Sequence, residues 1–485
     1  MEFARLVTYL EKLEGTASHT RMIAILAELL GECPADEIDI VCYFTLGSIA
    51  PGHSRIFLGM GESLVRSSIA LAFDADESTV GQMKTVGDWG DVAYRLGGRK
   101  EAKFQDLFAF APPLTVKDVH RGFMAIASAS GAGAQETKIR ILAAMLSGTG
   151  PRERRYLARL ATGEMRLGAG EMTILDALAD AFLGSKKERP PLEHAYNISS
   201  DIGLVAKTLK ERGLSGVQAI GITLFRPIKP MLAQRVGRLE EILSKIPSGT
   251  VSVEEKYDGE RIQAHKDGDR VRLFSRRLKD VTDQYPDIVG QVREHVHAPS
   301  AILDGEAVAY DLRRGTYYLF QQLMQRRRKY RVEEYVEKYP VRYMVFDLLY
   351  LKWESYLQRD YPARRARLEE IVQDSPLIAA TDRLVTSDLD RIRQFFHACL
   401  ARGLEGIVVK SCAQDSSYRA GSREWAWIKW KPSYGSELSD TLDLVVVGAY
   451  PGRGRRAGTY GSLLCAAYHD EKDIFQTVCK MGTGF

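Results

Sequence analysis

The pattern of hydrophobic residues changes sharply along this 485-residue chain close to Phe225. Before that point apolar residues recur at three- and four-residue spacing, as at Leu6, Leu10 and Leu13, which is typical of amphipathic helices. The segment RPIKPMLAQ then brings two prolines, which oppose a helix and favour an extended linker. Beyond it, short alternating apolar runs predict strands, with one helical stretch around residues 364–372.

A third pattern of hydrophobic residues begins after Ser433. Three strand-like runs, LDLVVVGAY, SLLCAAY and IFQTVCK, occur there with no obvious helical pattern. The length allows two to four domains at roughly 100–200 residues each. We therefore predict a multidomain protein with an all-α domain (residues 1–225), an α+β domain (226–433) and a small β domain (434–485).

Composition excludes several classes of protein. Hydrophobic residues make up 45% of the chain and charged residues 27%, an ordinary globular balance that excludes a disordered or collagen-like chain. No apolar run approaches the ~20 residues that cross a bilayer, and the N-terminus is amphipathic and acidic, unlike a signal peptide. The six cysteines form no CxxC pair, so we expect reduced thiols in a cytoplasmic protein without a membrane. The net charge of +4 is too small to identify a partner.

The sharpest motif is KYDGER, which begins at Lys256 after the alternating Val251 and Val253. A lysine at a strand end beside Gly259 is a candidate nucleophile, because glycine lets a nucleotide approach the backbone closely. Arg261 would then hold ribose or phosphate. The alternative is an exposed Lys-Asp-Gly turn without chemistry.

Other charged residues make that alternative less favourable. Period-two alternation in AILDGEAVAY places Asp304 and Glu306 on one strand face. The segment EGIVVK starts at Glu405, and Lys429 and Lys431 share one face of WIKWK. Such cations suit a triphosphate, and carboxylates suit a hard divalent ion. The sequence has no Walker loop and no GxGxxG turn, so nucleotide binding would need another architecture.

In the order KYDGER, FSRRLKDVT, LDGEAV, YMVFDLLYL, EGIVVK and WIKWK, the chain resembles the covalent nucleotidyltransferases. In detail it is similar to the ATP-dependent DNA ligases of the archaeal and eukaryotic replicative type. The resemblance extends over essentially the whole chain. IASASGAGAQETKIRILAAML and GEMRLGAGEMTILDALA resemble that family's helical DNA-binding domain, and RPIKPMLAQ its interdomain linker.

The resemblance implies an adenylation domain at 226–433, an OB-fold at 434–485 and roles for individual residues. ATP would be the AMP donor and Mg²⁺, or another divalent cation, the metal. Lys256 would carry AMP, Glu254 would contact the adenine, and Phe346 would stack on it. Arg261, Arg276 and Glu306 would bind ribose and phosphate, and Arg423 and Lys429 would hold phosphates, with Lys431 as a second candidate. Glu306 and Glu405 would be the metal carboxylates.

The implied reaction is the sealing of 5′-phosphate/3′-hydroxyl nicks in duplex DNA during replication, repair and recombination, with a link to cell division. We expect a monomer in the cytoplasm of an archaeal or bacterial cell, associated with the nucleoid. Family members continue for several strands beyond the KMGTGF segment and end in a basic motif that orients pyrophosphate. The expected OB-fold is therefore partial here, and we expect weakened self-adenylation.

Two further segments have open interpretations. A basic run, Arg326–Arg328 with Lys329 and Arg331, suits duplex phosphates or a solvated charged face. The segment QDLFAF resembles a sliding-clamp docking motif through Gln105, Leu107, Phe108 and Phe110, although these apolar side chains would also suit the domain's own core. Glycine pairs such as Gly131/Gly133 suit either phosphate binding at helix N-termini or simple helix punctuation.

Two other functions compete with nick sealing. An RNA ligase or RNA-capping guanylyltransferase would share the lysine motif, but the N-terminal resemblance to a DNA-binding domain argues against it. A non-catalytic nick-binding protein would fit an incomplete OB-fold. The intact KYDGER motif, together with Glu306, Glu405 and Lys429, argues against that reading.

Overall fold

The computed structural model describes residues 1–85, 87–97, 113–246, 249–326, 332–432, 444–452, 459–469 and 473–482. Contacts among them separate two compact units. One holds the helices up to Ala219, apart from residues 197–200, together with the C-terminal strands. The other holds residues 197–200 and the described residues between 220 and 432. In the part of the chain so described, no helix is long and apolar enough to cross a membrane.

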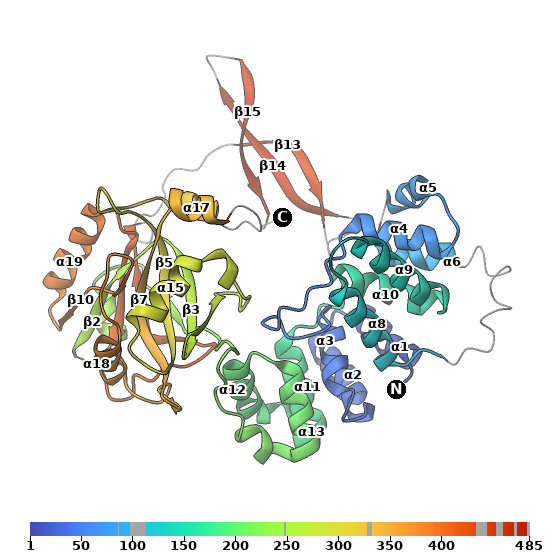
Figure 1. Cartoon of the computed structure of the whole chain (residues 1–485), viewed down its shortest axis with the longest axis horizontal. Helices are drawn as coiled ribbons and strands as arrows, with labels where there is room; N and C mark the ends of the chain where they lie inside the picture. The colour runs from blue at the N-terminus through green and yellow to red at the C-terminus, as the bar shows by residue number, and fades with distance from the viewer. Residues whose placement is uncertain are drawn as a thin grey trace. The chain divides into compact units, whose positions relative to one another are not determined.

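The N-terminal unit is helical, as predicted (Figure 1). Apolar faces form its core, and local caps start several helices: Ser18 accepts from the Arg21 N–H, and Thr115 forms a capping box with Asp118. Its helices are α1 (Phe3–Glu14), α2 (His19–Glu32), α3 (Ile38–Thr45), α4 (Glu62–Ala72), α5 (Glu77–Gln82), α6 (Trp89–Gly97), α8 (Val116–Ser128), α9 (Ala134–Ser147), α10 (Pro151–Thr162), α11 (Glu171–Leu183), α12 (Arg189–Ser199) and α13 (Ile202–Gln218), with 3-10 turns at Met83–Thr85 and Lys186–Glu188.

The glycine pairs fall at helix boundaries, as the sequence indicates. Gly133, with a φ of 81°, precedes α9, Gly150 precedes α10, and Gly170 precedes α11. A buried ion-pair network also joins distant helices: Arg159 Nη1 lies 2.7 Å from Glu14, and its Nε lies 2.9 Å from Asp88. Because Arg159 is only 1% exposed, this network fixes how the helices pack.

The second unit is built on two sheets (Figure 1). A five-stranded sheet has the order β1-β12-β11-β2-β10, and a seven-stranded sheet contains β4-β3-β5-β7-β8, with β6 on β5 and β9 on β7. Strands β3 and β4 form an antiparallel hairpin, with Gly268 at a φ of 55° in its turn. The strands are β1 (Leu232–Arg235), β2 (Val251–Lys256), β3 (Glu260–Asp267), β4 (Arg270–Ser275), β5 (Ser300–Asp311), β6 (Thr316–Tyr317), β7 (Val341–Leu351), β8 (Glu354–Ser355), β9 (Ile378–Ala380), β10 (Arg383–Thr386), β11 (Gly406–Ser411) and β12 (Arg423–Trp430).

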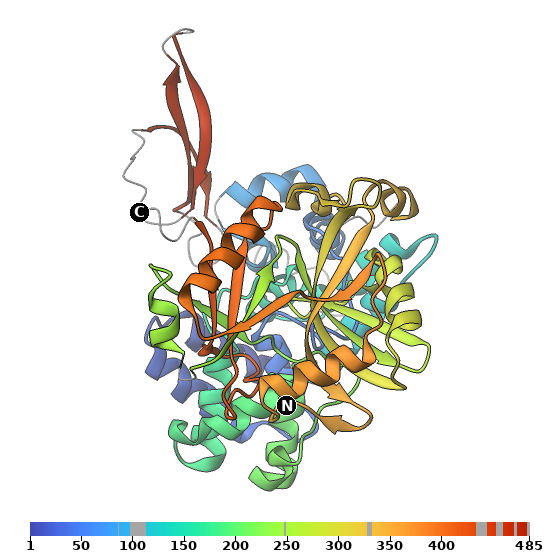
Figure 2. The same ribbon diagram turned by 90° about the vertical axis from the view of Figure 1, so that its left-hand side faces the viewer.

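Helices cover both sheets. α15 and α18 pack on the seven-stranded sheet, and α19 packs on β2, β10 and β11 of the other (Figure 2). Of these, only α18 was predicted, because α15 and α19 interrupt a region whose strands dominate its pattern. The helices are α14 (Glu241–Lys245), α15 (Pro286–His295), α16 (Phe320–Met324), α17 (Val332–Lys338), α18 (Tyr361–Ile371) and α19 (Leu389–Ala401), with a 3-10 turn at Thr282–Gln284.

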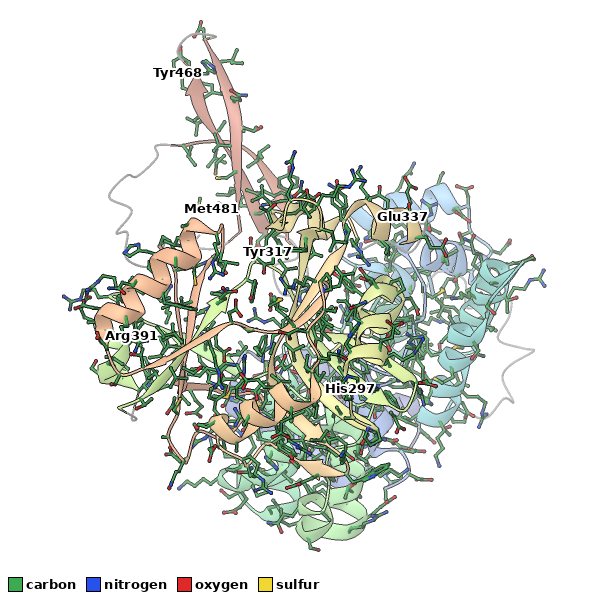
Figure 3. The ribbon with its side chains drawn as sticks, turned by 60° about the vertical axis from the view of Figure 1, so that its left-hand side comes forward. His297, Tyr317, Glu337, Arg391, Tyr468 and Met481 are labelled. Atoms are coloured by element: carbon green, nitrogen blue, oxygen red, sulfur yellow. The ribbon has the colours of Figure 1, made fainter. Side chains whose placement is uncertain are left out.

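The last described strands form an antiparallel sheet, β13 (Val445–Pro451), β14 (Tyr460–His469) and β15 (Ile474–Met481), which matches the three predicted runs. Tyr468 and Met481 lie on this sheet in Figure 3 and are 51% and 43% exposed. Its assignment to an OB-fold stays a prediction.

The structure corrects the interpretation of the basic run at its first residue, Arg326. Arg326 neither faces solvent nor is free for phosphate, because its buried guanidinium pairs with Asp287 at 2.6 and 2.8 Å. Arg327, Arg328, Lys329 and Arg331 lie outside the described residues, as do the clamp-motif residues Gln105, Leu107, Phe108 and Phe110.

Candidate active site

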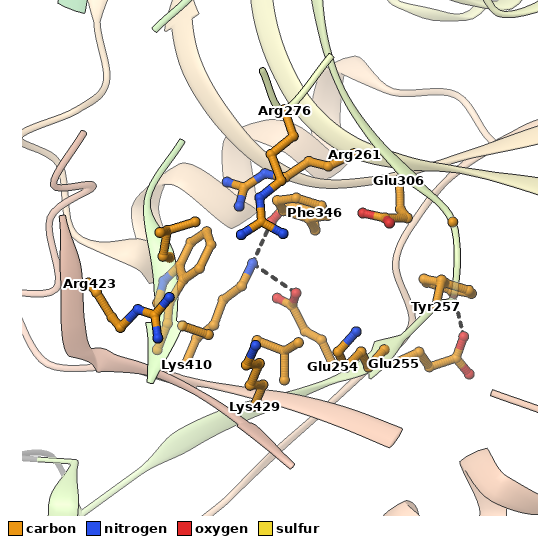
Figure 4. Close-up of a pocket in the computed structure, with 16 residues that line it drawn as sticks. Glu254, Glu255, Tyr257, Arg261, Arg276, Glu306, Phe346, Lys410, Arg423 and Lys429 are labelled. Carbon is orange, nitrogen blue, oxygen red and sulfur yellow. Dashed lines mark hydrogen bonds and ion pairs between the residues drawn. The ribbon is translucent and has the colours of Figure 1, made fainter. Parts of the chain in front are cut away.

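A cavity of about 220 Å³ in the second unit is lined by strands of both sheets (Figure 4). It gathers Lys256 and the seven residues predicted to bind the nucleotide, but not Lys431, the second phosphate candidate. Its walls comprise Leu232, Ala233, Glu254, Glu255, Lys256, Tyr257, Gly259, Arg261, Arg276, Glu306, Phe346, Val408, Lys410, Arg423, Trp427 and Lys429.

Lys256 ends β2 and is 21% exposed. Its ammonium contacts Oε2 of Glu405, whose Oε1 accepts from Lys431 Nζ at 2.7 Å. The Glu405 N–H also donates to the Lys256 carbonyl at 3.0 Å. Gly406 follows with a φ of 151°, and a side chain there would meet the Trp430 carbonyl, so glycine is needed at this turn. The turn therefore holds a carboxylate against the candidate nucleophile.

Arg261 is fixed from several directions. Its guanidinium pairs with the buried Asp304 at 2.6 and 3.0 Å and donates to the Met231 carbonyl at 2.8 Å. Tyr418 donates to the same Asp304 carboxylate at 2.8 Å. Burial opposes the charge, but Asp304, Tyr418 and Glu306 together more than offset it and raise the pKa of Arg261. Arg261 is thus a permanent, preoriented cation in the wall of the cavity.

Glu306 has the opposite environment. Burial raises its pKa to about 7, while Lys256 and Arg261 oppose the rise. Within the described part of the chain, its carboxylate makes no hydrogen bond or ion pair of its own. A carboxylate whose pKa is close to 7 and that makes no ion pair of its own is suited to bind an added cation.

The described residues contain no cluster of three or more metal-ligating side chains. The candidate donors are Glu306 and Glu405, which lie close enough that Glu405 contributes to the raised pKa of Glu306. Both oxygens of Glu405 also contact lysines. Mg²⁺ is commonly held by one or two carboxylates plus substrate phosphates and water. The two glutamates therefore fit a magnesium ion that arrives with a phosphorylated substrate.

One end of the cavity is aromatic and contains a buried ion pair. Lys410 Nζ lies 2.8 Å from Glu254 Oε2 and 2.8 Å from the Phe346 carbonyl. It also lies 4.5 Å from the Trp427 ring centroid. Phe346 and Trp427 meet edge to face at 6.2 Å. These rings offer a stacking surface, whereas the carboxylate predicted to contact adenine is already bound to Lys410 and the Tyr361 hydroxyl.

The remaining predicted residues take separate positions. Arg276 follows β4, and Arg423 and Lys429 lie on β12; all three line the cavity. Glu405 lies beside the cavity through its contact with Lys256 and is not among the lining residues. Cations, carboxylates and an aromatic surface around one lysine can together bind a nucleoside triphosphate and transfer a phosphoryl group to that lysine.

Several residues of this site had no role assigned to them from the sequence. Lys410 is 1% exposed yet ends an apolar strand, and Trp427 is 4% exposed on β12. A charged residue at a position that alternation assigns to a buried face could have indicated Lys410. Tyr418 and Tyr361 come from other elements and left no local signal.

Comparisons with known proteins agree with this chemistry. Residues 230–431 match the family described as "ATP dependent DNA ligase domain", and residues 2–179 match "DNA ligase N terminus". DNA ligase 1 of Methanosarcina acetivorans is 43% identical over 492 residues, covering 100% of this chain and 83% of that protein. The DNA ligase of Caldivirga maquilingensis is 43% identical over 495 residues, covering 100% and 81%. A solved structure named "Pmar-Lig_PreS3" shares the fold at a TM-score of 0.55 and 17% identity, over 99% of this chain and 88% of that one.

Proposed function

The chain belongs to the ATP-dependent DNA ligases, and from this premise we propose that Lys256 carries the AMP group in nick sealing. The observation that carries the proposal is the cavity, in which Lys256 is surrounded by the groups that phosphoryl transfer requires. The seven predicted cavity residues keep their proposed roles: Glu254, Arg261, Arg276, Glu306, Phe346, Arg423 and Lys429.

In the first step the Lys256 nitrogen attacks the α-phosphorus of ATP. A P–N bond forms, the bond to the bridging oxygen breaks, and pyrophosphate leaves. The ammonium must first lose a proton, and Glu405 Oε2, which contacts Nζ, is placed to accept it. Arg261 and Lys429 would offset the charge on the phosphates, and Phe346 would stack on the base.

The two later steps would take place against the same residues of the cavity. The nick 5′-phosphate attacks the AMP phosphorus and releases Lys256, giving a DNA-bound AMP through a pyrophosphate linkage. The 3′-hydroxyl then attacks the 5′-phosphate, and AMP leaves with its bridging oxygen. Mg²⁺ held by Glu306 and Glu405 would neutralise charge on the phosphoryl oxygens. Lys431, paired with Glu405, is a further phosphate candidate on this side.

We further propose a three-domain organisation: a helical DNA-binding domain, an adenylation domain and an OB-fold domain to which the C-terminal strands belong. Nicked duplex DNA would be the partner of the helical domain. A sliding clamp would be a second partner through the segment around Phe108, and the protein would act as a monomer at the nucleoid. Glycine-bounded helix starts such as that of α9 support the DNA role, because free N–H groups there suit phosphate oxygens.

The test is a substrate comparison on the full chain. Nicked DNA and an RNA duplex nicked at the same position are incubated with ATP or GTP, with Lys256→Arg as the inactive control. We expect nicked DNA to be sealed with ATP and not with GTP. Faster sealing of the RNA, or turnover with GTP in place of ATP, would contradict the proposal.

A further inference from the structure

We propose that Glu255 and Arg402 are positioning residues, which hold Glu405 against Lys256. Glu255 is among the residues that line the cavity, but its two carboxylate oxygens contact Tyr257 and Arg402. This inference rests on the proposed function of Lys256. Successive residues of β2 point to opposite faces of the sheet, so Glu255 lies on the face opposite to Glu254 and Lys256.

Glu255 is a buried charge with two partners. Its side chain is 2% exposed, in contrast to Arg402, whose side chain is 50% exposed. One carboxylate oxygen accepts from the Tyr257 hydroxyl, and the other pairs with Arg402 Nη2. A buried carboxylate needs such partners because burial alone disfavours its charged form. The pair therefore constrains Arg402, although half of the Arg402 side chain is exposed.

Arg402 begins the short turn that delivers Glu405. It caps α19, and the N–H groups of Gly403 and Leu404 donate to Leu400 at 2.9 Å and Cys399 at 3.1 Å. Gly403 has a φ of 79°, the left-handed conformation that ends many helices. Only two residues separate Arg402 from Glu405, so a shift of the arginine moves the carboxylate.

Two ties consequently join this turn to β2. At one end, the Arg402 side chain pairs with Glu255. At the other, the Glu405 N–H donates to the carbonyl of Lys256 at 3.0 Å. The ties attach to adjacent residues of one strand, so together they set the distance from the Glu405 carboxylate to the lysine nitrogen. Loss of the first tie leaves the side of the turn next to α19 without its link to β2, whereas the Glu405 N–H and the β11–β2 ladder still hold the other end.

Loss of the Glu255–Arg402 pair should affect the chemical step and not the binding of ATP. Two of the groups that would bind the nucleotide, Arg261 and Phe346, belong to the other sheet. The others, Glu254, Arg423 and Lys429, lie within strands β2 and β12 and not on this turn. We therefore expect the loss of the pair to slow lysine adenylation while the KM for ATP stays constant. A misplacement of about 1 Å in such a site can cost about 100-fold in rate, and we expect a 10- to 100-fold decrease.

The variants are Arg402→Met, Glu255→Gln and their combination, with Arg402→Lys as the conservative rescue. Arg393→Met is the matched control, because Arg393 also lies on α19 but pairs at the surface with Asp390 and with Glu240 at 3.1 Å. The full chain is used throughout. Single-turnover formation of the lysine–AMP adduct is measured against ATP concentration, and hydrogen exchange of the segment around residues 400–408 is followed without ATP.

We expect Arg402→Met and Glu255→Gln to slow adenylation and to speed exchange in that segment alone. The combined variant should be no slower than either, because both remove one interaction. Arg402→Lys should recover part of the rate, and Arg393→Met should match the parent. Unchanged exchange and rate, a raised KM for ATP, or faster exchange throughout the second unit would each overturn the inference. A parent protein that forms no adduct would instead refute the proposed function, and the exchange measurement would still decide the positioning role.

Discussion

Lys410 offers the sharpest test of how the base end of the cavity is held together. It is 1% exposed and pairs at 2.8 Å with Glu254, which is 2% exposed. Burial lowers the pKa of Lys410, and Glu254 opposes that shift. Lys410→Met retains the length of the side chain and its packing against the rings of Phe346 and Trp427, so the change removes mainly the charge.

The expected cost follows from what remains around Glu254. Removing one partner of a buried ion pair usually costs about 3–5 kcal/mol. Here the Tyr361 hydroxyl still donates to Glu254, and Arg365 lies 3.8 Å away, so we expect about 3 kcal/mol, the lower end of that range. For a unit of this size that corresponds to a decrease of about 6–12 °C in the unfolding midpoint.

The assay is calorimetric unfolding of the full chain, with the transition of the second unit assigned by its shift on adding ATP. Glu254→Gln in the Lys410→Met background removes the uncompensated charge, and we expect it to recover more than half of the lost midpoint. Lys279→Met, at an exposed lysine, is the control. A decrease of less than about 2 °C for Lys410→Met, or no recovery in the double variant, would refute the reasoning.

Three further predictions concern metal, base and DNA. The raised pKa of Glu306, about 7, means that its carboxylate ionises as the pH rises through 7. Less Mg²⁺ should therefore be needed for adenylation at pH 8 than at pH 6, and Glu306→Gln should abolish this difference; a pH dependence that survives the substitution would contradict it. Phe346→Ala should raise the KM for ATP about 10- to 100-fold with nick affinity unchanged, because base stacking is worth about 1–3 kcal/mol; an unchanged KM would exclude stacking. Nicked-duplex binding should fall at least about tenfold between about 50 and 200 mM salt and persist in a fragment of residues 1–225, and a salt-independent affinity would exclude phosphate contacts.

The sequence predicted most of the secondary structure that shapes the cavity. The strands expected to carry the candidate side chains are present: Asp304 and Glu306 lie on β5, and Lys256 ends β2. It failed where tertiary contacts decide the outcome. α19 lies between strands and was not predicted, although its turn presents Glu405.

Arg326 shows the same limit in another form. Four more basic residues in the next five positions suggested a charged surface. Arg326 is nevertheless buried and forms an ion pair with Asp287 of α15. Likewise, no local pattern could show that Lys410 and Tyr361 converge on Glu254, since Tyr361 starts a helix that lies far away in the sequence. Pairings between distant segments depend on the packing of the whole unit, whereas alternation and motif spacing are local.

The central claim is that AMP is carried on Lys256. The most direct measurement is peptide mass spectrometry of the full chain after incubation with ATP and Mg²⁺, under alkaline conditions that preserve a phosphoramidate. We expect one AMP group, located on Lys256, its release on addition of nicked DNA, and no adduct in Lys256→Ala. An AMP group on any other residue, or one that persists in Lys256→Ala, would contradict the assignment.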